Sequence, residues 1–175
     1  YSNHQYKAMK NAYAGHLKYS FQLRPHTVAD QAYIGAYQGI GVGYFNFGNP
    51  EELGNPLAVY LFQGGRIAQF SPRISLNYEW NFGASFGWKP YDEYDNPENQ
   101  IIGSKVNAYL NVNLYLKWAL SPKFDLMIGA TGSHFSNGNT QYPNSGLNTV
   151  DCKVGLVYNF NRRADELVQS RQRPI

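Results

Sequence analysis

Residues 74–88 read ISLNYEWNFGASFGW, and this stretch decides the fold class. Large apolar or aromatic side chains occupy the even positions, except for the small apolar Ala84, while polar or small side chains occupy the odd positions. A repeat of two residues places the two sets on opposite faces of an extended strand, whereas an amphipathic helix repeats every ~3.6 residues. The stretch is therefore predicted to be a long β-strand with one apolar face, formed by Ile74, Leu76, Tyr78, Trp80, Phe82, Ala84, Phe86 and Trp88.

The same period of two recurs along most of the chain. Residues 105–120 alternate between an aliphatic or Trp set and a polar set rich in Asn and Lys. Less regular segments bring the number of predicted strands to seven. Gly64 and Gly65 interrupt the alternation of one segment and are expected to mark a bulge. The predicted strands are residues 15–24, 33–47, 57–70, 74–88, 105–120, 124–137 and 147–160.

The composition of the two strand faces indicates an all-β barrel in a membrane. In a soluble barrel the polar face meets water and carries charge, whereas here it consists largely of Asn, Ser, Gly and Tyr. The apolar face carries large aromatics, and Trp88 and Trp118 lie near strand ends, as in an interfacial belt. The longest apolar run, residues 57–62, is too short for a membrane helix of about 20 residues. The favoured fold is an antiparallel up-and-down transmembrane β-barrel, and a soluble barrel is the alternative.

The lengths of the connections suggest how the barrel is oriented. Residues 71–73 and 121–123 form tight turns, whereas residues 48–56, 89–104 and 138–146 form longer loops. Outer-membrane barrels have short periplasmic turns and long external loops. An even-numbered barrel of about eight strands then needs one strand before residue 15, either short and irregular within residues 1–12 or upstream of them. We divide the chain into an N-terminal segment (1–14), the barrel (15–160) and a polar, periplasmic tail (161–175).

The overall charge argues against a nucleic-acid partner. The formal net charge is only +3, and the Lys and Arg residues are scattered rather than clustered. The histidines lack the spacing of a metal site, and no motif in the chain indicates a cofactor. No metal or cofactor is therefore predicted.

The candidate reactive residues are His134 and Ser136. Both take the even, apolar-face positions at the external end of the strand 124–137, at the predicted depth of the outer leaflet. Consecutive same-face Cα atoms are about 7 Å apart on a strand, a gap that an imidazole reaching toward a hydroxyl can close. Either the pair serves nucleophilic catalysis, or the two are interfacial polar residues bonded to a loop.

The stretch HFSNGNTQYPNSG, residues 134–146, resembles the signature of the PagL-type lipid A 3-O-deacylases, also seen in proteins labelled acyloxyacyl hydrolase-like. The barrel layout extends the resemblance over residues 15–160. Members of that family are eight-stranded barrels of the Gram-negative outer membrane. They use a His, a Ser and a Glu on the outer wall to hydrolyse an ester-linked acyl chain of lipid A. The resemblance thus implies a cofactor-free serine esterase acting on lipopolysaccharide.

Carried over by position, the resemblance implies that Ser136 is the nucleophile and His134 the general base. Asn137 and Asn144 match positions associated with the oxyanion hole, and Gly146 matches a loop glycine. The family's Glu, however, falls at Asn148.

The nearest carboxylate cannot replace the missing Glu. Asp151 has the opposite parity to Asn148 and is expected to form a lumenal ion pair beside Lys153. An Asn can orient a histidine but cannot stabilise an imidazolium by charge, and Asp to Asn in the trypsin triad costs about 10⁴ in turnover. The alternative function is therefore a weak or inactive barrel that binds lipid, is structural, or forms a homodimer or membrane complex.

Overall fold

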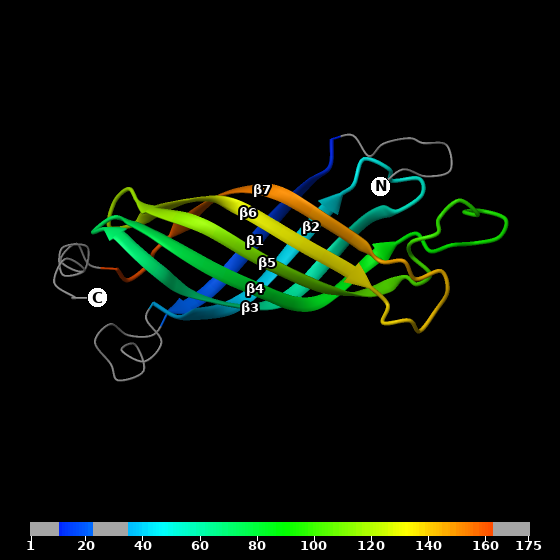
Figure 1. Cartoon of the computed structure of the whole chain (residues 1–175), viewed down its shortest axis with the longest axis horizontal. Coiled ribbons are helices and arrows are strands. Elements are labelled where there is room, and N and C mark those ends of the chain that lie inside the picture. The colour runs from blue at the N-terminus through cyan, green and yellow to red at the C-terminus, as the bar shows by residue number, and fades with distance from the viewer. Residues whose placement is uncertain (1–10, 23–34, 163–175) are drawn as a thin grey trace.

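The chain folds into one curled antiparallel sheet, in a computed structural model that describes residues 11–22 and 35–162 (Figure 1). The strands follow one another in chain order, which confirms the predicted up-and-down β-barrel topology. Residues 1–10 and 163–175, with most of the predicted N-terminal segment, candidate eighth strand and polar tail, lie outside the described residues. The seven strands are β1 (Tyr13–Gln22), β2 (Tyr37–Asn46), β3 (Gly54–Ser71), β4 (Ile74–Trp88), β5 (Val106–Ala119), β6 (Phe124–Ser136) and β7 (Leu147–Tyr158).

The two faces of the sheet differ as the alternation predicts, except at Trp88. The prediction that Trp88 lies on the outer face near the membrane interface is wrong: it is buried in the lumen, because Gly87 takes a φ of +86° and breaks the alternation at the end of β4. Asn111 and Asn113 are buried on the inner face of β5, while Leu110 and Leu114, which flank them in the sequence, are 44% and 51% exposed. Trp80 on β4 is likewise exposed on the outer face. A continuous apolar face of this size suits contact with lipid rather than water. In the part of the chain that the structure describes, no helix is long and apolar enough to cross a membrane.

The expected bulge at Gly64 and Gly65 is wrong in position. Both glycines pair in register with β4, and the register shift falls between Arg66 and Ala68. A side chain at Gly64 would collide with the hydroxyl of Tyr37 from β2. The glycine therefore makes room for the Tyr37 side chain of the neighbouring strand rather than breaking the ladder.

Aromatic side chains fill the lumen at the end that carries the long loops. Phe45, Trp88, Tyr109 and Phe135 are buried there, and the Phe135 ring lies 5.1 Å from each of the other three ring centroids. Aromatic pairs at this spacing add to the stabilisation from buried area. Three loop residues, Leu53, Ile101 and Ile102, belong to the same cluster, as does Leu147 at the start of β7. The core therefore also anchors the loops.

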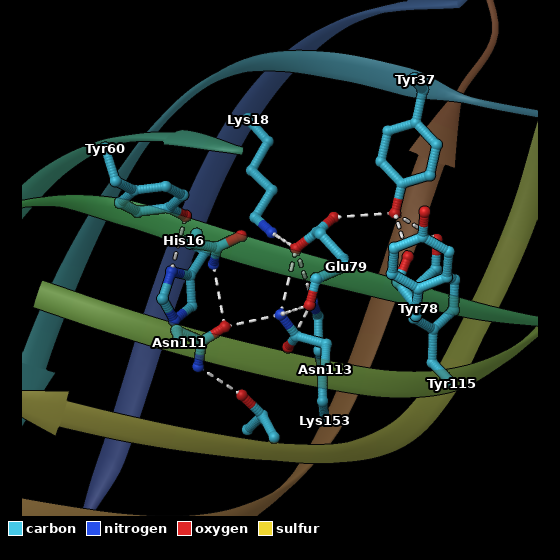
Figure 2. A network of polar contacts seen from close by, with 12 residues as sticks. His16, Lys18, Tyr37, Tyr60, Tyr78, Glu79, Asn111, Asn113, Tyr115 and Lys153 are labelled. Atoms are coloured by element: carbon cyan, nitrogen blue, oxygen red, sulfur yellow. Dashed lines mark hydrogen bonds and ion pairs between the residues drawn. The ribbon is translucent and has the colours of Figure 1, made fainter. Parts of the chain in front are cut away.

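A charged network occupies the lumen further along the barrel. Figure 2 shows Lys18, Tyr37 and Lys153 converging on Glu79 of β4. Lys18 of β1 forms an ion pair with Glu79, the Lys153 ammonium of β7 lies 3.5 Å from the same carboxylate oxygen, and the Tyr37 hydroxyl donates to the other oxygen at 3.1 Å. Asn113 donates to Glu79 at 3.2 Å. The carboxylate thus links β1 and β7, the two edges of the described sheet, to β4.

Glu79→Gln is expected to lower the stability of the barrel. The amide keeps the shape of the side chain but removes the only charge that compensates Lys18 and Lys153 within this described network. Breaking a buried ion pair by removing one partner costs about 3–5 kcal/mol. The temperature at which the folded band is lost on gels of the purified protein in detergent measures the effect. Glu98→Gln, which removes the same charge from an exposed loop, is the control and should leave that temperature unchanged.

Candidate functional site

His134 and Asn148 form a hydrogen-bonded pair on the outer wall. The register of β6 and β7 places them directly opposite each other, with Leu110 on the other side of His134. The Nδ1 atom of His134 lies 2.8 Å from the Oδ1 atom of Asn148. An amide oxygen can only accept, so this bond requires the proton on Nδ1. The Nε2 atom of the neutral ring is then free to accept a proton.

Ser136 lies two residues further along β6, opposite Ala108 and on the same face as His134. Its side chain is half-buried. Within residues 11–22 and 35–162 its hydroxyl makes no hydrogen bond. The structure therefore joins two of the three predicted catalytic residues, His134 and Asn148, by a hydrogen bond. Ser136 lies beside them, and no hydrogen bond joins its hydroxyl to His134. Catalytic hydrogen bonds are often long in the absence of substrate.

The side chains of Asn137 and Asn144 point into the loop 137–146. The Asn137 amide nitrogen donates to the carbonyl of Gln141 at 2.8 Å, and its oxygen accepts from the backbone N–H of Asn139 at 3.0 Å. The Asn144 amide donates weakly to the Asn139 side chain at 3.4 Å. Both amides brace the loop in this state, and Asn144 is the less firmly held donor of the two.

Gly146 lies against the side chains of His134 and Ser136. Its φ is +68°, and a Cβ atom placed on it would lie 3.2 Å from Cε1 of His134 and 3.6 Å from Cβ of Ser136. Its N–H donates to the carbonyl of Ile101 at 3.4 Å. A side chain at this position would press on the imidazole, which explains why the loop returns to β7 through a glycine.

For the esterase activity that the resemblance implies, Gly146→Ala is expected to reduce acyl-chain hydrolysis by at least ~10-fold, because the new methyl group would displace the imidazole or the loop. Gly138→Ala is the matched control. Gly138 also has a left-handed φ, +64°, in the same loop, but an added Cβ there meets nothing within 4 Å. The two variants therefore share the left-handed backbone and differ in the contacts of the added methyl group, which at Gly146 are Phe135 O at 3.1 Å, His134 Cε1 at 3.2 Å and Ser136 Cβ at 3.6 Å. Initial rates on purified lipid A separate them, and equal losses in both would count against a steric role for Gly146.

An open groove of about 360 Å³ begins at His134 and Asn148 on the outer wall. Gly132, next to His134 on this face of β6, forms its floor between Val112 of β5 and Val150 of β7. A Cβ atom on Gly132 would meet only the carbonyl of Thr149, at 3.8 Å. Ala130, the next residue on this face of β6 away from the loops, is also small. Sequence analysis did not identify Gly132 as part of a site. The signal was present in the sequence, because Ala130 and Gly132 are small residues on a strand face that is otherwise bulky and apolar.

Asp151 lies on the opposite face from the site. It is paired with Thr131, which lies three positions before His134 and therefore on the other face of β6. The expected ion pair with Lys153 is not what the structure shows, since the Lys153 ammonium reaches across the lumen to Glu79 and Asn113. The residues that the structure describes contain no group of three or more His, Cys, Asp or Glu side chains that could hold a metal ion.

Comparison with models of protein families identifies the family of the chain. The model of the family "Lipid A 3-O-deacylase (PagL)" matches residues 14–157, from β1 to the end of β7. The chain belongs to the PagL lipid A 3-O-deacylase family. No curated protein and no solved structure was found to match it. Membership makes the chain an outer-membrane β-barrel of a family of lipid A deacylases, and the exposed apolar wall is the surface that such a barrel presents to lipid.

Proposed function

We propose that this PagL-family barrel is a serine esterase that removes an ester-linked acyl chain from lipid A in the outer leaflet of a Gram-negative outer membrane. The observation that carries the proposal is the 2.8 Å contact between His134 and Asn148 on the lipid-facing wall, beside Ser136. A histidine held by a side-chain acceptor, next to a serine, is the arrangement that activates a hydroxyl nucleophile. The barrel of residues 15–160 is the catalytic unit.

In the proposed reaction, Nε2 of His134 takes the proton of the Ser136 hydroxyl as Oγ attacks the ester carbonyl carbon. The tetrahedral oxyanion collapses, the bond to the sugar oxygen breaks, and the imidazolium returns the proton to that oxygen. Water then attacks the acyl-serine with the same histidine as base, releasing the fatty acid and restoring the hydroxyl. Asn148 keeps the proton on Nδ1 and fixes the plane of the ring. Asn144 and Asn137 in the adjoining loop are the proposed donors to the oxyanion.

The groove accounts for how the acyl chain would be held. Its floor at Gly132 and its walls at Val112 and Val150 are apolar and begin beside His134. An acyl chain lying there has its ester end at the reactive residues and its tail toward the middle of the membrane. Because the groove opens on the outer wall, the substrate can enter sideways from the leaflet without leaving the lipid phase.

The second candidate function is a barrel that binds lipid A, or forms a homodimer or membrane complex, without hydrolysing it. Asn148 favours this alternative, because a neutral amide cannot stabilise the imidazolium that forms during turnover, which reduces the rate by up to about 10⁴ in a trypsin triad.

Mass spectrometry of lipid A from cells with and without the protein tests the two functions. The esterase reading requires lipid A that has lost one acyl chain only when the protein is present, and full acylation when Ser136→Ala is expressed instead. Fully acylated lipid A in all three strains, with the barrel folded in the membrane, supports the non-catalytic function.

A further inference from the structure

The loop 137–146 is held from outside by the loop 89–105. The Gly146 N–H bonds to the carbonyl of Ile101. A Cβ atom on Gly103 would lie 2.7 Å from the carbonyl oxygen of Pro143 and 2.9 Å from the carbonyl carbon of Tyr142, so the two loops touch through backbone. Pro143 is buried at this contact. The position of Gly146 against His134 and Ser136 therefore depends on where the backbone of residues 101–103 lies.

Asn99 sets the course of that backbone. Its side chain is fully buried, with 0% exposure. The Oδ1 atom accepts hydrogen bonds from the N–H groups of Ile101 and Ile102, both at 3.0 Å. The Nδ2 atom donates to the carbonyls of Lys89 at 2.8 Å and Glu52 at 3.2 Å. One amide thus joins the loop 47–53, the base of the loop 89–105, and the turn that carries Ile101.

The side chains of Ile101 and Ile102 explain why this turn must be held. They are 4% and 1% exposed and insert into the aromatic cluster that fills the end of the lumen. Among the described residues, their backbone N–H groups have no hydrogen-bond acceptor other than Asn99 Oδ1. An unsatisfied buried donor is costly, so loss of the amide favours movement of the turn.

We propose that Asn99 is a positioning residue for the reaction: it fixes Ile101 to Gly103, and through them the placement of Gly146 against His134 and Ser136. The residue touches no reacting group. This inference rests on the proposed function for its effect on turnover, but its effect on the loop 137–146 is independent of whether the chain is active. It assigns a catalytic consequence to a residue more than 30 positions away from His134 in the sequence.

The variants that test this are Asn99→Ala, Gly103→Ala and Asn96→Ala. Gly103→Ala leaves Asn99 intact but forces apart the loops at Pro143. Asn96→Ala is the matched control, because the Asn96 amide donates to the carbonyls of Lys89 and Pro90 in its own loop and of Glu52 in the loop 47–53, but it forms no hydrogen bond with Ile101 or Ile102. All three change the loops outside the strands, and the folded band on gels checks that the barrel is intact.

For turnover, Asn99→Ala and Gly103→Ala are each expected to lower kcat on lipid A by about 100-fold, the size of effect produced by a displacement of about 1 Å in an active site. KM should change by less than ~3-fold, because the groove at Gly132 is untouched. Asn96→Ala should retain kcat. Equal losses in Asn96→Ala and Asn99→Ala, or a rise in KM with kcat preserved, would overturn the proposal.

Hydrogen–deuterium exchange gives a readout that does not require activity. The peptide covering residues 137–147 is expected to exchange at least ~10-fold faster in Asn99→Ala and Gly103→Ala than in the wild type or Asn96→Ala. If the wild type releases no fatty acid, the proposed function fails while this measurement still tests the positioning. Unchanged exchange in Asn99→Ala would show that the loop keeps its place without the amide, and the proposal would be wrong.

Discussion

Replacing Asn148 by glutamate is expected to raise the deacylase rate, by up to about 10⁴-fold, or to create activity where none is measurable. The reason is electrostatic. Asn148 already lies on the correct face and accepts a hydrogen bond from His134 Nδ1, so the position provides orientation without charge. A carboxylate there would stabilise the imidazolium that forms as Ser136 is deprotonated. Release of free fatty acid from purified lipid A in detergent measures the rate.

Asn148→Asp sharpens this experiment, because aspartate is nearly the same size as asparagine and changes only the charge. Both Asn148→Asp and Asn148→Glu should be faster than the wild type, and Asn148→Ala slower, since it removes the acceptor that orients the ring. Asp151→Asn is the control at a carboxylate on the opposite face, and should leave the rate unchanged. A wild type that is already fast and is slowed by both acidic variants would show that the amide is a working partner and that a charge is not needed.

Ser136→Ala is expected to abolish fatty-acid release, because it removes the nucleophile and leaves only the background of bound substrate and loop donors. Residues that act as a unit are strongly non-additive, so Ser136→Ala should give the same residual rate in the wild type and in the Asn148→Glu background. The apparent loss is then larger in Asn148→Glu, by the factor gained from the carboxylate. Lipid A binding by both proteins, measured in the same detergent, should persist.

A residual rate in Ser136→Ala that still responds to Asn148→Glu would contradict the serine mechanism. It would point to His134 acting directly on water. The four proteins are the wild type, Asn148→Glu, Ser136→Ala and the double variant. If all four are folded and bind lipid A but none releases fatty acid, the lipid-binding function is correct instead.

The period-two pattern of the sequence predicted the seven strands and the faces of most of their side chains, with Trp88 as an exception. Side chains on a strand alternate strictly, so parity alone assigned His134, Ser136 and Asn148 to one face and excluded Asp151 from it. The resemblance of residues 134–146 to a known signature then predicted the family that the comparison over residues 14–157 shows. Local information determines these features because each depends only on neighbours in the chain.

Contacts between strands and between loops could not be obtained in this way. Parity says which face a residue takes, but the register of β6 against β7, which sets Asn148 opposite His134 rather than one pair away, depends on the whole loop 137–146. The sequence placed Lys153 beside Asp151, whereas across the lumen its ammonium meets Glu79 of β4. Closing a sheet brings residues more than 70 positions apart within contact distance, and no local pattern encodes that approach.

For the candidate site too, some features could be predicted from the sequence and others only from the tertiary structure. The sequence identified His134 and Ser136 as the candidate reactive residues and showed Asn148 where the family has a Glu. Only the tertiary structure decided that Gly132 opens a groove beside them and that Gly146 fits against the imidazole because Asn99 holds a different loop in place. Each of these depends on empty or filled space between segments distant in the chain. Such space is set by how side chains pack when the sheet curls, which is a property of the assembled barrel rather than of any one strand.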